Sequence, residues 1–218
     1  MQRAEYCALI MFGIHDFGLF LPAGILLNLT PGPDTVYILG RSIAQGREAG
    51  VASALGISLG SVFHTCAAAL GLSAILATSA LAFGTIKLIG SAYLIFLGAK
   101  MLLDRRKRLS LPSNFRRRTT LAAFRQGMLT NILNPKVALF FLAFLPQFID
   151  PASNAKVAAF LSLGLTFVTT GTIWCLILAW FASAFSERLR KNETISQWLN
   201  RTAGTLFVFL GLRLATTK

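Results

Sequence analysis

A break interrupts an apolar run near the start of the chain, and it reads Asn28-Leu29-Thr30-Pro31-Gly32-Pro33-Asp34. Proline removes a backbone donor and clashes with the preceding helical turn, so Pro31 and Pro33 must break or kink a helix. In lipid, the freed backbone groups need partners inside the protein or in a wet cavity. An ionisable residue beside such a break, here Asp34, is typical of a transport site. The alternative is a plain proline kink in a packing helix.

The composition places the chain in a membrane. Of the 218 residues, 55% are hydrophobic and 13% are charged, whereas soluble domains carry roughly 25% charged residues. The mean hydropathy is +0.64. A net charge of +13 would suggest nucleic acid as the partner of a soluble protein, but the basic residues lie between apolar runs, so membrane orientation explains them better. We therefore expect an all-α integral membrane protein that contacts the lipid bilayer and has no nucleic-acid partner.

Six apolar stretches approach or exceed the length of about 20 residues that crosses the hydrocarbon core of a bilayer. We predict them at residues 17–40, 50–78, 81–103, 121–149, 156–185 and 202–215. Proline breaks the first and the fourth, the latter at Asn134-Pro135-Lys136. The sixth is short, because 14 residues rise only about 21 Å in a helix. It either begins earlier, near Ile195, or enters the membrane without crossing it.

Lysine and arginine residues set the predicted orientation. Fifteen of them fall on one side of the six spans, nine of these between residues 100 and 125, and four fall on the other side. Positive residues stay in the cytoplasm, so both termini should face outward. The stretch 104–120 is then a basic cytoplasmic loop. The same charge could also bind anionic lipid headgroups.

The chain contains an internal repeat. Gly24-x3-Asn28-x2-Pro31-Gly32-Pro33 matches Gly127-x3-Asn131-x2-Asn134-Pro135-Lys136 at an offset of 103 residues. A second match relates residues 94–100 to residues 207–213 at an offset of 113. The predicted architecture is therefore two three-helix repeats, 17–103 and 121–218, which are inverted because three spans is an odd number. Such repeats bind their substrate near the membrane midplane, where the two broken helices meet. Shared apolar composition is the alternative explanation.

We expect one transmembrane domain, residues 17–218, after an N-terminal extension of residues 1–16. The apolar part of this extension, residues 6–14, is too short to span, and no cleavage site of small residues precedes Phe17. A secretory signal peptide is therefore not expected. Met11 raises the hypothesis that translation starts there. Mass spectrometry of the native N-terminus tests it, and a peptide covering residues 2–10 would contradict it.

Asp34 and Lys136 are the charged residues of the two breaks. Charged side chains at membrane depth are costly and usually face a cavity or pair with each other, so we expect these two to be partners. Asp34 could also attract a substrate amino group, carry a coupling proton, or cap the helix that restarts after Pro33. Lys136 could instead bind the C-terminal carbonyl groups of a half-helix.

Three amides flank the breaks, namely Asn28, Asn131 and Asn134, and an amide can both donate and accept. Beside the N-termini of half-helices they could recognise a carboxylate. Alternatively, they satisfy the polar groups of the kinks themselves. The predicted substrate and coupling residues are Asn28, Pro31, Gly32, Pro33, Asp34, Asn131, Asn134, Pro135 and Lys136.

His64 and Lys87 are weaker candidates for the same site. His64 shares a helical stripe with Gly56 and Gly60, a pattern that permits close helix contact within or between protomers, so a homo-oligomer is possible. A packed, hydrogen-bonded histidine is the favoured interpretation over a proton relay. Lys87 lies near the outer end of the third span, where its stem can snorkel to the headgroups.

Other chemistries find little support. Cys7, Cys66 and Cys175 are dispersed and only two histidines are present, so we expect no metal site and no cofactor. We expect Cys66 and Cys175 to act as small hydrophobes, and residues 169–171 to serve helix packing. No HExxH, GxSxG or GxxxxGKS/T motif occurs, so we expect neither an enzyme nor an ATP-driven pump.

Taken together, the motifs resemble those of the LysE/RhtB family of amino-acid exporters, named for lysine export and for homoserine/threonine resistance. The resemblance covers nearly the whole chain from Phe17 onward and rests on residues 28–34, Gln45-Gly46-Arg47-x2-Gly50, Gly56-x3-Gly60, Lys87-x2-Gly90-x2-Tyr93 and Asn131-x2-Asn134-Pro135-Lys136, then on Phe144-Leu145-Pro146-Gln147-Phe148. It implies a secondary active exporter in a bacterial inner membrane, coupled to protons and working by alternating access. Neutral or basic amino acids, or close derivatives, are the implied substrates.

Two other functions stay open. A cation or metal exporter of a related fold would need more carboxylates and histidines than the spans hold, because hard cations take several oxygen ligands. A non-transporting membrane protein, such as a scaffold or sensor, would leave the paired breaks unexplained. An efflux assay separates both from an amino-acid exporter.

Overall fold

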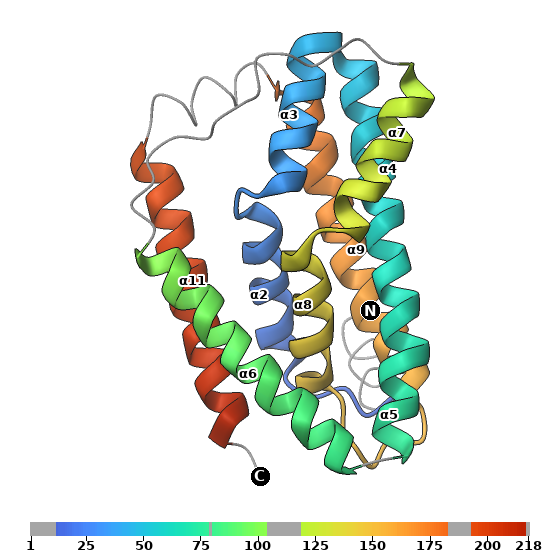
Figure 1. Ribbon diagram of the computed structural model, residues 1–218, viewed down its shortest axis with the longest axis vertical. Coiled ribbons are helices and arrows are strands. Elements are labelled where there is room, and N and C mark those ends of the chain that lie inside the picture. The colour runs from blue at the N-terminus through green and yellow to red at the C-terminus, as the bar shows by residue number, and fades with distance from the viewer. Residues whose placement is uncertain (1–11, 79, 104–118, 183–192, 217–218) are drawn as a thin grey trace.

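The computed structural model describes residues 12–78, 80–103, 119–182 and 193–216, and this part of the chain folds as an elongated bundle of helices (Figure 1). One isolated antiparallel bridge, between Ile14 and Ile149, is its only β pairing. The predicted all-α fold class is therefore confirmed for the described residues. Most of the predicted basic loop 104–120 lies outside them.

In chain order the elements are α2 (Phe17–Leu29), α3 (Pro33–Gln45), α4 (Arg47–Ala67), a π-helical turn (Ala68–Leu72), α5 (Ser73–Thr78), α6 (Ala80–Leu103), α7 (Thr120–Ile132), α8 (Pro135–Ala143), a 3-10 turn (Leu145–Phe148), α9 (Lys156–Trp180) and α11 (Glu193–Thr216). Each of the six predicted apolar stretches contains one or two of these helices. The part of the fifth stretch beyond residue 182 lies outside the described residues.

Both predicted breaks are present. After α2, the chain leaves the helix at Thr30, whose hydroxyl donates to the Leu26 carbonyl oxygen at 2.7 Å, and Pro33 opens α3. After α7, Asn134 interrupts the helix and Pro135 opens α8, with a bend of 48° between the two helices. Proline fits the first position of a helix because its missing N–H would have no helical partner there. The same residue type therefore ends one half-helix and begins the next.

Two helices are longer than predicted. α3 continues past residue 40 to Gln45, so Arg41, which we expected in a loop, is buried in the helix with 2% of its surface exposed. α11 begins at Glu193, close to the earlier start near Ile195 that the sequence analysis gave as an alternative, and its 24 residues rise about 36 Å. The predicted apolar stretch begins only at residue 202 because hydropathy marks only the apolar part of a helix.

By length and hydropathy, two continuous helical segments of the described chain are able to cross a membrane, Arg47–Ile75 and Lys156–Trp180. The bent pair Thr120–Ile132 and Pro135–Phe148 makes a third if it counts as one span. Shorter apolar helices cover Phe17–Leu29, Leu88–Leu103 and Arg201–Leu212. These lengths are those of a membrane protein, whereas the count of six crossings stays a prediction.

Glycines let α4 lie directly against α7. A Cβ on Gly56 would lie 2.0 Å from the Phe124 carbonyl oxygen, and a Cβ on Gly127 would lie 2.5 Å from the Ser53 carbonyl oxygen. Gly60 on α4 faces the same helix. The Gly56-x3-Gly60 pattern therefore packs two helices of one protomer together, which is one of the two uses that the sequence allowed.

The pair formed by α6 and α11 packs in the same way and stands at one side of the bundle (Figure 1). A Cβ on Gly98 would lie 2.5 Å from the Gly204 carbonyl oxygen. A Cβ on Gly211 would lie 2.9 Å from the Ser91 carbonyl oxygen. The two contacts are equivalent in the repeat. The offset of 113 residues relates Gly98 to Gly211 and Ser91 to Gly204.

The bundle has two apolar cores, one toward each end (Figure 1). The core at the α2–α8 end is the larger, and its fully buried aromatic side chains include Phe20, Phe140, Phe144, Phe160 and Phe207. The core at the α3–α7 end is smaller and joins α3, α4 and the end of α9 around Ile38, Leu39 and Ala54. The broken helices lie between the two cores.

Residues just before α2 are attached to the bundle. The His15 N–H donates to the Phe148 carbonyl oxygen at 3.0 Å, and the Asp150 N–H donates to the Gly13 carbonyl oxygen at 2.8 Å. Ile14, between them, is buried in the larger core. The end of the predicted extension 1–16 thus pairs with the segment after α8, while residues 1–11 lie outside the described chain.

Candidate functional site

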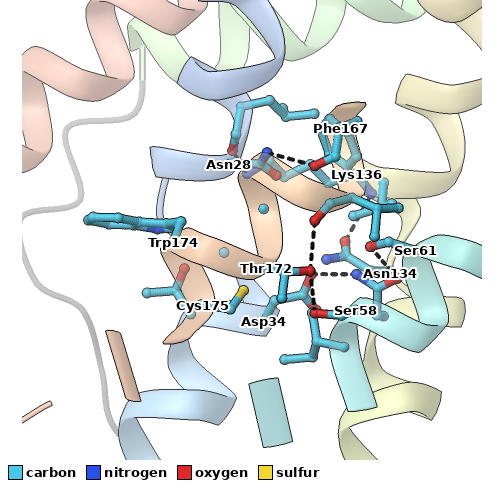
Figure 2. A pocket seen from close by; sticks show the side chains of 18 of the residues that line it. Asn28, Asp34, Ser58, Ser61, Asn134, Lys136, Phe167, Thr172, Trp174 and Cys175 are labelled. Atoms are coloured by element: carbon cyan, nitrogen blue, oxygen red, sulfur yellow. Dashed lines mark hydrogen bonds between the residues drawn. The ribbon is translucent and has the colours of Figure 1, made fainter. Parts of the chain in front are cut away.

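The two breaks meet in the middle of the bundle around a small cavity, and α4 and α9 complete its wall (Figure 2). Its volume is about 40 Å³. On this measure one water needs about 10–15 Å³, so the cavity holds a few waters at most. The polar side chains in its wall are Asn28, Thr30, Asp34, Thr35, Ser58, Ser61, Asn131, Asn134, Lys136 and Thr172.

Asp34 lies in the first turn of α3, where the helix dipole favours a carboxylate. Its Oδ2 accepts a hydrogen bond from Asn131 Nδ2 at 2.9 Å, and Asn131 Oδ1 accepts in turn from Ser61 Oγ at 3.2 Å. Its Oδ1 is buried and has no hydrogen-bond partner among the described residues. Asp34 accepts no backbone N–H bond in the same part of the chain, so of the alternatives that the sequence allowed it does not take the role of helix cap. A buried, unpaired carboxylate oxygen marks a place where a donor from outside the protein would be bound.

Lys136 does not pair with Asp34, so the expected ion pair is wrong. Its Nζ donates to the carbonyl oxygens of Leu27 and Thr30, both at 2.8 Å. No ion pair joins Lys136 to Asp34 in the described chain, although the two charges lie close enough to influence each other. The end of α2 leaves carbonyl groups without helical partners, and the partly buried Lys136 ammonium group binds two carbonyl oxygens there. Of the two alternatives that we considered for Lys136, the structure has the carbonyl contact.

Asn28 joins the first break to α9. Its Nδ2 donates to Thr170 Oγ1 at 3.2 Å. It also donates to the Phe167 carbonyl oxygen at 3.4 Å (Figure 2). A Cβ on Gly171 would lie 3.1 Å from Asn28 Oδ1, so the absence of a side chain there makes room for the amide. Residues 169–171, which we expected to serve helix packing, therefore include a hydrogen-bond partner of the site.

The other break residues shape the backbone. Asn134 Oδ1 accepts from the Lys136 N–H at 3.0 Å and thereby caps α8. Gly32 and Asn134 line the cavity. Of the predicted substrate and coupling residues, Pro31, Pro33 and Pro135 do not line it.

Of the two weaker candidates, His64 does not line the cavity. His64 is buried behind Asn131, with Nε2 3.1 Å from the Asn131 carbonyl oxygen and its ring stacked on Phe141 at a centroid distance of 5.7 Å. This is the packed, hydrogen-bonded histidine that we favoured. Lys87 belongs to α6, and its side chain lies outside the described part of the structure.

The structure adds residues that the sequence did not single out for this site, among them Ser58, Ser61, Thr172, Trp174 and Cys175. Ser58 Oγ and Thr172 Oγ1 are hydrogen-bonded to each other at 2.8 Å across α4 and α9 (Figure 2). A signal existed, since Ser58 and Ser61 share one helix face, as do Thr172 and Cys175. It is weak, because membrane helices use small and polar residues mainly for packing.

The cavity offers groups of opposite charge beside an apolar wall. Asp34 is its carboxylate and Lys136 its ammonium group. Its apolar side chains include Leu27, Ile57 and Phe167. No group of three His, Cys, Asp or Glu side chains that could hold a metal ion forms within the described residues. This set of groups fits a small zwitterion with an apolar side chain.

Comparisons with known proteins agree with this chemistry. Residues 25–218 match the LysE type translocator family. An uncharacterised membrane protein of Vibrio cholerae is 32% identical over 205 residues, which cover 94% of this chain and 98% of the relative. An uncharacterised membrane protein of Bacillus subtilis is 29% identical, with 92% and 98% covered.

A third relative has a functional name. The leucine efflux protein of Klebsiella pneumoniae is 27% identical over 207 residues, which cover 95% of this chain and 98% of the relative. Solved structures contain no match. Because the family match extends over most of the sequence, the chain belongs to the LysE type translocators, membrane transporters that export amino acids.

Proposed function

We propose that this protein is a secondary active exporter of neutral amino acids in a bacterial inner membrane. One observation carries the proposal: Asp34 Oδ1 is buried without a partner on a cavity between two broken helices. The α-ammonium group of an amino acid would supply the missing donor. Hydrogen bonds to charged groups are stronger than those between neutral groups, so this contact would fix one end of the substrate.

The other end of the substrate faces the second break. The N-terminus of α8 and the ammonium group of Lys136 both lie at the cavity, and both favour negative charge. A carboxylate is therefore bound best there. Transporters with broken helices commonly point half-helix N-termini at anionic substrate groups.

The charges favour a neutral over a basic substrate. Among the residues that line the cavity, Asp34 is the one carboxylate, and the α-ammonium group would occupy it. A second ammonium group, as in lysine, would meet Lys136 or apolar side chains such as Ile57 and Phe167, where an unpaired charge is costly. The leucine efflux proteins among the relatives support a neutral, apolar substrate.

The mechanism that we propose is alternating access with proton exchange. The cavity of about 40 Å³ is too small for an amino acid, so the described state is nearly closed and the site must widen toward one side at a time. Asp34 binds either a proton or the substrate ammonium group. Entry of a proton therefore displaces the amino acid, and the proton gradient drives export.

The architecture that we propose is two inverted three-helix repeats with six crossings and both termini outside. Contacts that occur twice support it. Asn28 contacts α9 beside Gly171, and its repeat counterpart Asn131 contacts α4 beside Gly60. The excess of lysine and arginine on one side of the spans supports the orientation.

Efflux from whole cells tests the function. Cells without their own amino-acid exporters are given the protein, loaded with dipeptides, and assayed for every amino acid outside. We expect selective release of one or a few neutral amino acids, lost when a protonophore collapses the proton gradient. Correctly inserted protein that releases no amino acid contradicts the proposal, and release that persists with protonophore contradicts the proton coupling alone.

A further inference from the structure

Arg41 is a buried charged residue that the proposed substrate site does not use. Its Nε donates to Tyr37 Oη at 3.2 Å, and its Nη2 donates to Gln126 Oε1 on α7 at 2.8 Å. Tyr37 Oη in turn donates to the Ala123 carbonyl oxygen at 3.0 Å. These four residues, Tyr37, Arg41, Ala123 and Gln126, join α3 to α7 and form what we call the polar crossing.

The repeat provides an apolar counterpart of this crossing. The offset of 103 residues relates Tyr37 to Phe140, Arg41 to Phe144, Phe20 to Ala123 and Ala23 to Gln126. The rings of Phe20 on α2 and Phe144 at the end of α8 stack with their centroids 5.9 Å apart, and those of Phe140 and Phe144 lie 4.6 Å apart. Phe20, Ala23, Phe140 and Phe144 are all 1% exposed or less, and we call them the aromatic crossing.

The two crossings lie on opposite sides of the cavity. In Figure 1, α3 and α7 occupy the upper half of the bundle, α2 and α8 occupy the lower half, and the breaks lie between them. The residues of the broken helices that line the cavity belong to the stretches 27–35 and 131–137. The four residues of the aromatic crossing are buried. In the polar crossing Tyr37, Arg41 and Ala123 are buried and Gln126 is partly buried, so packed side chains fill both ends of the path in this state.

We propose that the polar crossing is the gate through which the amino acid enters the cavity and that the aromatic crossing is the gate through which it leaves. This inference rests on the proposed function, because only a transporter with alternating access needs a gate at each end. The polar crossing lies at the end of the bundle where α3 ends at Gln45 and α4 begins at Arg47. The distribution of basic residues predicts that this end faces the cytoplasm.

The different chemistry of the gates suits their positions. When the polar crossing parts, water replaces each hydrogen bond and solvates the guanidinium group, so the net cost of opening is small. When the aromatic crossing parts, buried apolar rings are exposed, so this gate stays shut unless bound groups favour the open form. A dry outer gate also keeps external protons from Asp34 until the exchange step.

A native cysteine reports the opening of each gate. Cys175 lines the cavity, so replacing Cys7 and Cys66 with serine leaves one thiol between the two crossings. The reagent is a membrane-impermeant methanethiosulfonate, applied to inside-out or right-side-out membrane vesicles without substrate. Labelling then measures access to the cavity from one side at a time and requires no transport.

Gln126→Ala removes the α7 acceptor of the Arg41 guanidinium group. We expect Cys175 to be labelled roughly tenfold faster in inside-out vesicles, because a lost bond to a charged group shifts the closed–open equilibrium by about that factor, and at an unchanged rate in right-side-out vesicles. Phe144→Ala should give the opposite pattern. Gln147→Ala, a glutamine at the α2–α8 end, is the matched control and should not speed labelling in inside-out vesicles.

An unchanged rate for Gln126→Ala in inside-out vesicles, or an equal rise from both sides, would overturn the assignment. A reversed pattern would overturn it as well. Misfolding is recognised by size-exclusion chromatography in detergent, and Tyr37→Phe, which removes one hydroxyl group, then serves as the milder variant. Side-specific labelling together with absent amino-acid efflux would reject the proposed substrate and retain the gates, so the two failures are distinguishable.

Discussion

The first and second breaks occupy equivalent positions in the repeat, but they are stabilised differently. At the first, carbonyl groups at the end of α2 accept hydrogen bonds from Lys136, which belongs to the other half of the chain. At the second, Asn134 caps α8 within its own half. The backbone of the first break thus depends on the second repeat, whereas the second break is closed locally.

The difference shows how two similar halves form a site with direction. The offset of 103 residues relates Asp34 to Val137 and Lys136 to Pro33, so the two charges stand at positions that are not equivalent. If each half carried the same charge, the site would treat both ends of a substrate alike. In the site that we propose, one carboxylate and one ammonium group at unequal positions would give a zwitterion a single preferred orientation.

Lys136→Met should have the largest effect, because it removes the contact by which one break supports the other. The carbonyl groups of Leu27 and Thr30 would lose their partner, so we expect the free energy of unfolding to fall by about 2–5 kcal/mol and efflux to be lost. Thermal unfolding of the purified protein in detergent measures the first effect. Lys156→Met is the control, since its Nζ donates to the Ser153 carbonyl oxygen at 2.7 Å, three residues away in the same segment. Equal losses in both variants would show that the contact with α2 is not special.

Asp34→Asn should separate charge from packing at the first break. The variant keeps the shape of the side chain and a bond to Asn131, so stability should change little. Efflux should fall about 10- to 100-fold, because hydrogen bonds to a charged group contribute about 1.5–3 kcal/mol. Asp150→Asn is the control, as this exposed carboxylate accepts from the Ala152 N–H and lies outside the cavity wall. Wild-type efflux from Asp34→Asn would remove the carboxylate from the mechanism.

Asn28 and Asn131 occupy equivalent positions in the repeat, so they test whether the two breaks contribute equally to stability. Asn131 is 1% exposed and bonds to Asp34 and Ser61, whereas Asn28 is only partly buried. We expect Asn131→Ala to lower the free energy of unfolding by about 2–3 kcal/mol and Asn28→Ala by about 1 kcal/mol. Denaturation curves of the two variants under one condition give the comparison. If Asn28→Ala proved the more harmful, the first break would be the tighter of the two.

Substitutions of the glycines opposite these amides, Gly60 and Gly171, should have the smallest effects on stability. A Cβ on Gly60 would lie 2.9 Å from the Met128 backbone oxygen, whereas a Cβ on Gly171 meets only the Asn28 side chain, at 3.1 Å. We expect Gly60→Ala to cost about 1–3 kcal/mol of stability and Gly171→Ala less than about 1 kcal/mol. Gly71→Ala is the control, because no atom lies within 4 Å of its added Cβ. Similar melting temperatures for Gly60→Ala and Gly71→Ala would contradict this account of the α4–α7 contact.

The sequence predicted the breaks well because proline acts locally. Pro33 and Pro135 stop one helix and start the next whatever surrounds them, so both break positions could be predicted from the sequence. The amides Asn28, Asn131 and Asn134 were found for a related reason, since polar groups in an apolar run need partners at the same depth. The residues placed at the breaks by sequence therefore do meet in space.

The hydrogen-bond partners of the polar side chains and the burial of Arg41 were harder to predict because they depend on tertiary packing. Lys136 was expected to bind Asp34, but the end of α2 presents two carbonyl groups closer to its ammonium group. Arg41 was counted as a loop charge because hydropathy falls at residue 41, although α3 continues for another turn. Ser58 and Thr172 carried no signal of their own, since a serine or threonine in a membrane helix often bonds only to the carbonyl four residues earlier.

The glycine contact between α6 and α11 has a consequence for biosynthesis. About ninety residues separate Leu103 from Glu193, so α6 leaves the ribosome well before its partner exists. At about 5–20 residues per second, the delay is roughly 5–20 s. During that time the groove around Gly98 must be covered by lipid or by the insertion machinery. The order of synthesis thus leaves α6 without its main contact until the last described helix is made.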